Sequence, residues 1–166
     1  EHVSEEQGNL YLDYIRKNSP ELLETIDDFK QNDSHGGPVK FTYPGIGSIS
    51  PSTLRYIKVL SDLKNIFGDI SDKKIIEIGA GYGGQCLILN KLFTPSQYSI
   101  LDLDEASELS DKYLKINGIN ARIIKIHEVY DLDEDFDIII SNYAYSELSR
   151  ELQDLYYDKI IKRSNN

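Results

Sequence analysis

The stretch that most restricts the fold of this chain is Lys73–Leu89, KKIIEIGAGYGGQCLIL. A short run of β-branched residues leads directly into a glycine-rich turn, and a helical pattern of apolar residues follows. Glycine tolerates positive φ and lets a ligand approach the backbone, and the first amides of the following helix point towards whatever is bound. The stretch therefore predicts a buried strand, a ligand-binding turn and a helix.

The glycine spacing at Gly79, Gly81 and Gly84 suits two classes of cofactor. It satisfies the fingerprint of dinucleotide-binding proteins, so the glycines alone do not discriminate between the classes. Glu77 stands two residues before the first glycine, where an acidic side chain suits a ligand with an ammonium group and would repel a pyrophosphate. We therefore expect an ammonium-bearing ligand, and a purely structural turn is the alternative.

Strands and helices are expected to alternate after the glycine turn. The predicted strands are Lys74–Ile78, Gln97–Leu101, Ala121–Ile126 and Phe136–Ile140. The predicted helices are Gly83–Phe93, Glu105–Asn117 and Glu147–Ile161, the last capped by Ser146. Such alternation produces parallel pairing with right-handed crossovers. The expected fold is an α/β, Rossmann-like three-layer sandwich with strand order 3-2-1-4, which binds its ligand beyond the carboxyl ends of the strands.

An acidic residue, Asp102, ends the second predicted strand. It lies about twenty residues beyond the glycine turn, where an acid commonly receives the ribose hydroxyls of a nucleotide-like cofactor. Leu103 follows and is placed to cover one face of an adenine ring. These two residues extend the candidate ligand site to a second strand.

The amino-terminal part is predicted to be helical. Its helices are expected at Asn9–Lys17, Pro20–Phe29 and Pro51–Phe67. Gln31–Ser50 is rich in glycine and proline and is longer than ordinary connections, which indicates a lid, a binding loop or a flexible linker. Tyr43 within it is a candidate substrate contact. The expected division is 1–50 as a helical or lid segment and 51–166 as the ligand-binding core.

Charge and composition disfavour several classes of partner. The formal net charge of -10 argues against nucleic acid, whose binding is driven by Lys and Arg. No apolar run is long enough to cross a bilayer and no targeting segment is visible, so we expect a cytoplasmic protein. The single cysteine, Cys86, is expected to be buried and structural, and His2, His35 and His127 lack the spacing of metal ligands.

Four segments of the chain resemble the class I S-adenosylmethionine-dependent methyltransferases and, among these, the sugar O-methyltransferase family. They are YPGIGSISPSTLRYIKVLSDL, KIIEIGAGYGGQ, ILDLDEA and ISNYAYSEL, and the resemblance covers roughly residues 40 to 162. It implies S-adenosylmethionine as cofactor and a small carbohydrate as substrate. The cofactor contacts that it implies are Glu77, Gly79, Ala80, Gly81, Asp102, Leu103, His127, Glu128 and Asn142. His127 and Glu128 are equally compatible with a surface turn.

Methylation of a sugar hydroxyl requires a base that takes the hydroxyl proton. Glu147 is the ionised acceptor in the segment after the fourth predicted strand, although a glutamate there also complements a helix dipole. His127 is the reserve candidate, since its ordinary pKa suits proton transfer. Tyr143 and Tyr145, together with Tyr43, are expected to form walls of the substrate site.

The chain departs from the methyltransferase pattern at its end. A class I sheet has seven strands, whereas four are predicted here, and the later strands supply part of the substrate wall. A non-catalytic cofactor-binding or partner-binding domain is therefore the alternative function, and an NAD-dependent oxidoreductase is disfavoured by Glu77. The fourth strand, Phe136–Ser141, is expected to be an uncovered edge that favours homodimers or aggregates.

Overall fold

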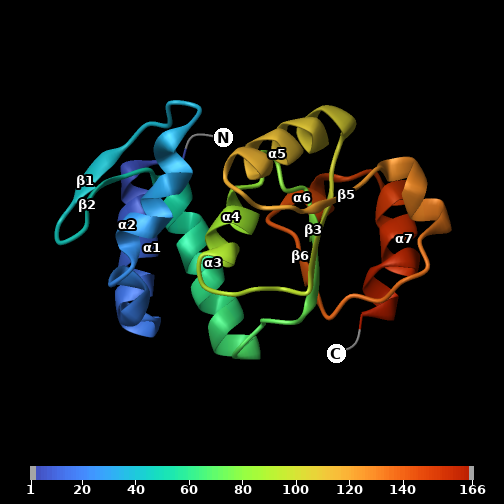
Figure 1. Ribbon diagram of the computed structural model, residues 1–166, viewed down its shortest axis with the longest axis horizontal. Helices are drawn as coiled ribbons and strands as arrows, with labels where there is room; N and C mark the ends of the chain where they lie inside the picture. Colours follow the sequence, from blue (N-terminus) through green and yellow to red (C-terminus); the bar gives the residue numbers. More distant parts are fainter. Residues whose placement is uncertain (1–2, 165–166) are drawn as a thin grey trace. The chain divides into compact units, whose positions relative to one another are not determined.

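A computed structural model describes residues 3–164, and the chain divides after Asp69 into two compact units (Figure 1). Helix α3 (Pro51–Phe67), which was grouped above with the ligand-binding core, packs against α1 (Glu5–Asn18) in the amino-terminal unit. Within residues 3–164, no helix is long and apolar enough to cross a bilayer.

Helices make up most of the amino-terminal unit, as predicted. Helix α3 has the predicted bounds because the Ser50 side chain accepts a hydrogen bond from the backbone of Thr53 and Gly68, at φ 71°, ends it. The single helix predicted over Pro20–Phe29 is instead two short helices, η1 (Pro20–Leu23) and α2 (Ile26–Phe29). A third short helix, η2 (Lys30–Ser34), follows them.

The segment predicted as a long irregular loop contains an antiparallel hairpin, β1 (Phe41–Tyr43) and β2 (Gly47–Ile49). Gly45 and Gly47 adopt φ of 85° and 76° in its turn, a conformation that residues with a Cβ rarely take. The prediction missed the hairpin because each strand has only three residues and shows little periodicity.

A buried carboxylate fixes the start of α3. Asp33 accepts hydrogen bonds from the Ser50 backbone amide at 2.7 Å, the Ser50 hydroxyl at 2.7 Å and the Thr53 hydroxyl at 2.6 Å. Three donors satisfy a carboxylate that burial would otherwise make costly. Asp33 thus joins η2 to the first turn of α3.

The carboxyl-terminal unit contains a parallel sheet of four strands in the order β5-β4-β3-β6. The strands are β3 (Lys74–Ile78), β4 (Gln97–Leu101), β5 (Arg122–Ile124) and β6 (Ile138–Ile140). The order is the predicted one, and β3 and β4 have the predicted bounds. β5 and β6 are shorter than predicted, and Ile126 already begins the helix η3 (Ile126–Asp131).

Helices cover both faces of this sheet. They are α4 (Gly84–Asn90), α5 (Asp104–Ile116), η3, α6 (Ala144–Glu147), α7 (Arg150–Lys159) and η4 (Ile161–Arg163). Figure 1 shows α4 and α5 on one side of β3 and α7 on the other. The predicted three-layer α/β sandwich is confirmed.

The last predicted helix begins later than expected. Ser149, not Ser146, caps α7 by accepting a hydrogen bond from the Leu152 backbone amide at 3.4 Å. Ser146 instead donates to the carbonyl of Tyr143 within α6. Leu148, whose backbone is extended, separates α6 from α7.

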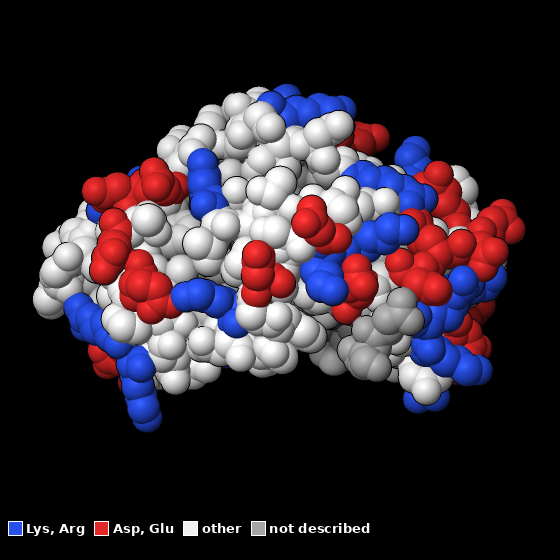
Figure 2. Space-filling view, turned by 60° about the horizontal axis from the view of Figure 1, so that its bottom comes forward, with Lys and Arg blue, Asp and Glu red and all other residues white. Residues whose placement is uncertain are grey.

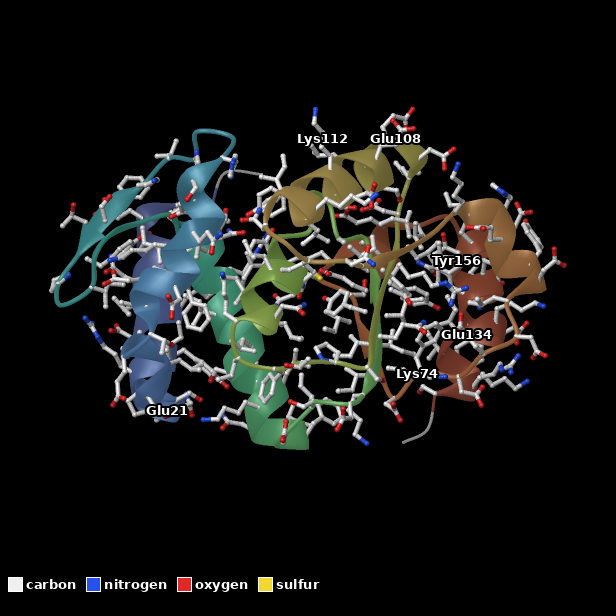
Figure 3. All side chains as sticks on the ribbon, viewed as in Figure 1. Glu21, Lys74, Glu108, Lys112, Glu134 and Tyr156 are labelled. Carbon is white, nitrogen blue, oxygen red and sulfur yellow. The ribbon has the colours of Figure 1, made fainter. Side chains whose placement is uncertain are left out.

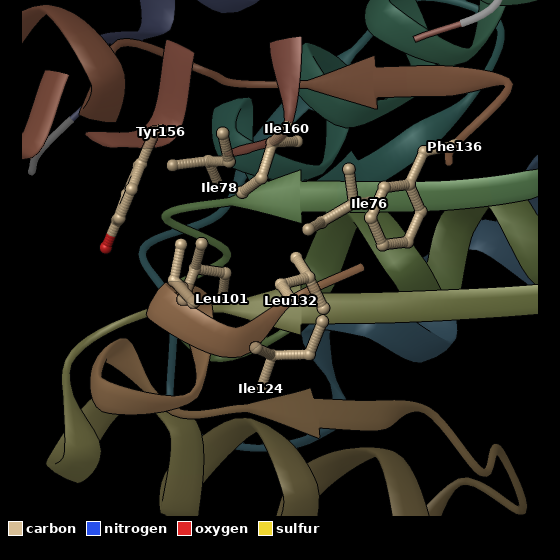
Figure 4. Packing of buried hydrophobic residues seen from close by; sticks show 9 residues of the cluster. Ile76, Ile78, Leu101, Ile124, Leu132, Phe136, Tyr156 and Ile160 are labelled. Atoms are coloured by element: carbon tan, nitrogen blue, oxygen red, sulfur yellow. The ribbon is translucent and has the colours of Figure 1, made fainter. Parts of the chain in front are cut away.

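The core between the sheet and α7 is apolar. Ile76 and Ile78 of β3 pack there with Leu101, Tyr156 and Ile160 (Figure 4). Because side chains of a strand alternate between its faces, Glu77 points to the opposite face, which α4 and α5 cover.

Within residues 3–164, β6 is the last strand on its side of the sheet. The side chains of Ile138 and Ile140 are buried, so the open part of this edge is its backbone rather than an exposed apolar row. β6 is therefore an edge strand, and what it offers to a partner is its backbone hydrogen-bonding groups.

Candidate functional site

The turn after β3 depends on glycine at position 79. Gly79 has φ 77°, and its amide donates to the Leu101 carbonyl at the end of β4. A Cβ at this position would lie 2.0 Å from the Cβ of Ala144, the first residue of α6. The turn and α6 are therefore in close contact, which only glycine permits.

Asp102 is oriented by two backbone amides. Its Oδ2 accepts a hydrogen bond from Gly81 at 2.8 Å and its Oδ1 accepts one from Leu103 at 2.8 Å. A carboxylate has about four acceptor sites, so each oxygen can accept a further hydrogen bond. Two hydroxyl donors on one ligand match this arrangement.

Glu77 is buried, with 2% of its surface exposed, in a hydrogen bond with the hydroxyl of Tyr98 on β4. Tyr98 donates to Glu77 Oε2 at 2.7 Å. The pKa of Glu77 is raised to about 7, chiefly by burial and also by the charge of Asp102, while the Tyr98 hydrogen bond lowers it. A pKa so far from the ordinary value is typical of functional sites.

Tyr98 was missed by the sequence reasoning. A tyrosine within a strand is a weak signal, and the pairing depends on the register in which Ile75 lies beside Tyr98 and Glu77 beside Ile100. That register places Tyr98 on the same face of the sheet as Glu77.

A cavity of about 60 Å³ lies at the carboxyl ends of β3 and β4. Its lining includes Gly79, Asp102 and Leu103, which were predicted as cofactor contacts, and Ala144 from α6. Tyr156 lines it from α7, from which its side chain projects towards the sheet (Figures 3 and 4). Apolar residues of the lining are Ile78, Leu101, Ile126, Leu148 and Leu152.

Several predicted site residues lie outside the lining of this cavity. His127 and Glu128 are exposed in η3, and Glu128 accepts a hydrogen bond from the Lys125 backbone amide at 2.6 Å, so it stabilises the start of that helix. Glu147 is exposed at the end of α6. Their assigned roles stay predictions. His2 lies outside the described residues.

Asn142 follows β6 and carries an unsatisfied donor. Its side chain is half-buried, and its Nδ2 is buried with no hydrogen-bond partner within residues 3–164. Native proteins rarely leave such a group unpaired, so a buried amide donor at this edge of the sheet is a candidate ligand contact.

The tyrosines predicted as substrate walls differ in their surroundings. Tyr143 is exposed and adopts φ 75°, an uncommon conformation for a residue with a Cβ. Tyr145 is anchored, because its hydroxyl donates to the Gln153 carbonyl at 3.0 Å. Both line a second hollow of about 270 Å³ beside Ile139 of β6. Tyr43 is buried in the amino-terminal unit against Gly8.

Charged residues do not form a single basic surface in the view of Figure 2, where acidic and basic side chains are interspersed. Among residues 3–164, no group of three or more His, Cys, Asp or Glu side chains is arranged to hold a metal ion.

No protein-family model and no curated protein matches this sequence. Solved structures do match. A protein of Methanococcus maripaludis assigned as an S-adenosyl-L-methionine-dependent methyltransferase is 21% identical, with a TM-score of 0.52 over 61% of this chain and 49% of that protein. A Pyrococcus horikoshii protein assigned as an RNA methyltransferase is 16% identical, with a TM-score of 0.55 over 88% of this chain and 70% of that protein. TehB from Haemophilus influenzae is 18% identical, with a TM-score of 0.51 over 64% and 36%.

The chain shares the Rossmann-like fold of these proteins. Because the identities are 16 to 21%, the similarity defines the fold and leaves the reaction to be argued from the site. The chain spans about half the length of the Methanococcus protein and about a third of TehB.

Proposed function

We propose that this chain binds S-adenosylmethionine at the glycine turn and transfers its methyl group to a hydroxyl oxygen of a small substrate, with a carbohydrate as the substrate class. The observation that carries the proposal is Asp102, held by the amides of Gly81 and Leu103 at the carboxyl end of β4 with two acceptor oxygens available. The choice of a carbohydrate as substrate class depends on the sequence resemblance of two segments, YPGIGSISPSTLRYIKVLSDL and ISNYAYSEL.

Polar groups at the carboxyl ends of the strands fit this cofactor, and of these Asp102 lines the cavity while Glu77 and Asn142 lie outside its lining. Asp102 suits the two ribose hydroxyls, the charge of Glu77 attracts the ammonium group, and the buried Nδ2 of Asn142 offers a donor. A cavity of about 60 Å³ is smaller than the roughly 300 Å³ at the lower end of small-molecule sites. The proposal therefore includes an outward movement of α6, whose Ala144 contacts Gly79 and lines the cavity.

When bound, the cofactor supplies a methyl carbon that the substrate oxygen attacks in line as the carbon–sulfur bond breaks. The chain has to align the two reactants, which supplies much of the rate, and to take the hydroxyl proton, for about 10² to 10⁴-fold more. Glu147 of α6 is the proposed base, since α6 follows β6 at the ligand-binding edge of the sheet. His127 is the reserve.

Cofactor binding is tested by calorimetry with S-adenosylhomocysteine and with NAD. The proposal predicts binding of the first and no response to the second. Binding of NAD without a response to S-adenosylhomocysteine would instead support a dinucleotide enzyme.

The base is tested with Glu147→Gln, and Glu151→Gln on the exposed first turn of α7 is the matched control. Methyl transfer to a panel of saccharides should be lost with Glu147→Gln and kept with the control, while the affinity for S-adenosylhomocysteine stays unchanged in both. Near-normal turnover of Glu147→Gln would move the assignment to His127.

A second candidate is a non-catalytic cofactor-binding domain that pairs with a partner or a second copy through β6. The observation in its favour is the open backbone edge of β6 within residues 3–164, beside the hollow of about 270 Å³. Sedimentation should then show a dimer, and cofactor binding should occur without turnover. A monomer with turnover would exclude it. The cytoplasmic location stays a prediction of the sequence.

A further inference from the structure

Two buried polar side chains form a hydrogen bond between β3 and β4, the two strands whose ends adjoin the glycine turn. Tyr98 of β4 donates its hydroxyl to Glu77 Oε2 of β3 at 2.7 Å, and both residues are at least 95% buried. We propose that Tyr98 is a positioning residue that holds the Glu77 carboxylate in place and keeps it able to attract the ammonium group of the cofactor as the pH falls. The inference rests on the proposed function.

The geometry allows little freedom at this pair. In the parallel register of β3 and β4, Tyr98 lies beside Ile75, and Ile75 and Glu77 share one face of the sheet. Strand pairing therefore fixes the face of the sheet on which Tyr98 lies, and its hydroxyl reaches a carboxylate oxygen on the neighbouring strand. A hydrogen bond to a charged acceptor in a dry environment is among the stronger ones in proteins.

Two titratable groups shift the pKa of Glu77, and a third, Cys86, is itself affected by Glu77. Burial raises the pKa of Glu77 most, the Tyr98 hydrogen bond lowers it, and the Asp102 carboxylate after β4 raises it. The thiol of Cys86 on α4 has a pKa raised well above its ordinary value by burial and by Glu77, so it stays neutral. Tyr98 is thus the neighbour that favours the ionised carboxylate.

A proton and an ammonium group compete for the same carboxylate. Below the pKa of Glu77, the affinity for an ammonium-bearing ligand should fall about tenfold per pH unit. Loss of the Tyr98 hydroxyl removes the interaction that opposes protonation, so the fall should begin at a higher pH. Above that pH both forms of the protein carry an ionised Glu77, and their affinities should converge.

The test compares the whole chain with Tyr98→Phe by calorimetry from pH 5.5 to 9. One ligand is S-adenosylhomocysteine, which carries the ammonium group, and the other is 5′-methylthioadenosine, which lacks it. We expect the pH midpoint of S-adenosylhomocysteine affinity to rise by about one unit in Tyr98→Phe, a roughly tenfold loss near pH 6. Affinity for 5′-methylthioadenosine should be unchanged.

Tyr113→Phe is the matched control, because Tyr113 is a buried tyrosine of α5. It should leave the pH dependence of both ligands as in the unmodified chain. An equal loss of both ligands at every pH in Tyr98→Phe would mean a purely structural effect. An unchanged pH midpoint would overturn the inference.

A ligand-independent readout separates this inference from the proposed function. Infrared titration can follow the carboxyl band of Glu77, assigned by its loss in Glu77→Gln, and its midpoint should rise in Tyr98→Phe. If the unmodified chain binds neither ligand, the proposed function fails and the role of Tyr98 towards the cofactor fails with it. If the unmodified chain binds both ligands but the infrared midpoint of Glu77 is the same in Tyr98→Phe, the Tyr98 inference alone is refuted.

Discussion

Glu77→Gln should make the folded chain more stable at neutral pH, because it replaces a buried ionisable group by a neutral one of similar shape. The pKa of Glu77 is about 7 in the folded chain against an ordinary value of 4.5, so the folded state holds its proton more tightly than the unfolded state. Below pH 4.5 both states are protonated. As the pH rises from 4.5 to about 7, only the unfolded state ionises, and stability is lost.

The size of this loss follows from the interval between the two pKa values. A difference of one in pKa corresponds to about 1.4 kcal/mol, so the loss approaches about 3 kcal/mol above pH 7. The substituted glutamine side chain cannot ionise, and its amide oxygen can still accept the Tyr98 hydroxyl. The advantage of Glu77→Gln over the unmodified chain should therefore grow by about 3 kcal/mol between pH 4.5 and 8.

Urea denaturation followed by circular dichroism at a series of pH values measures this difference. The chain has two compact units, and Glu77 lies in the carboxyl-terminal one, so the unfolding transition to compare is that of the carboxyl-terminal unit. Glu151→Gln, at an exposed position, should keep a constant difference from the unmodified chain across the series. Parallel curves for Glu77→Gln and the unmodified chain would refute the reasoning.

Four further substitutions test the site and the fold. Asp102→Asn should weaken S-adenosylhomocysteine binding about tenfold or more in calorimetry, because an amide group replaces one acceptor oxygen, and unchanged affinity would contradict the ribose contact. Gly79→Ala should lower the free energy of unfolding by about 3 kcal/mol, since its φ is 77° and the new Cβ would lie 2.0 Å from that of Ala144. Gly81→Ala, with open space around it, should cost about 1 kcal/mol, and equal losses would be inconsistent with the contact to α6. Asp33→Ala should destabilise the amino-terminal unit by about 3 kcal/mol in urea denaturation, because three hydrogen bonds into a buried carboxylate are lost, and a change below about 1 kcal/mol would contradict its role.

Local chemistry in the sequence determined the framework of the core. The β-branched run before Gly79 predicts β3, and the serine and proline at the start of α3 together with Gly68 predict its two ends. Strands that alternate with helices have few sensible arrangements, so the parallel order of the sheet followed from the same pattern. Asp102 was predicted from its distance along the chain, and the amide of Gly81 lies beside it in the structure.

The local sequence pattern could not predict where a helix begins when two residues are both suitable caps. Ser146 and Ser149 are both acceptable helix caps, and the choice of Ser149 follows from the packing of α7 against the sheet. The three-residue strands of the β1–β2 hairpin are stabilised by pairing with each other rather than by their own propensity.

Only the tertiary structure decided the environment of the candidate site. The contact between Ala144 and Gly79 joins residues far apart in the chain, and so does the hydrogen bond from Tyr98 to Glu77. The sequence places an acid before the glycine turn, but its charge state depends on how deeply the fold buries it and on which donor the strand register brings to it. Burial and register arise when separate strands and helices pack together, which is why residue types and their spacing predict the ligand class while the pKa of Glu77 follows from the fold alone.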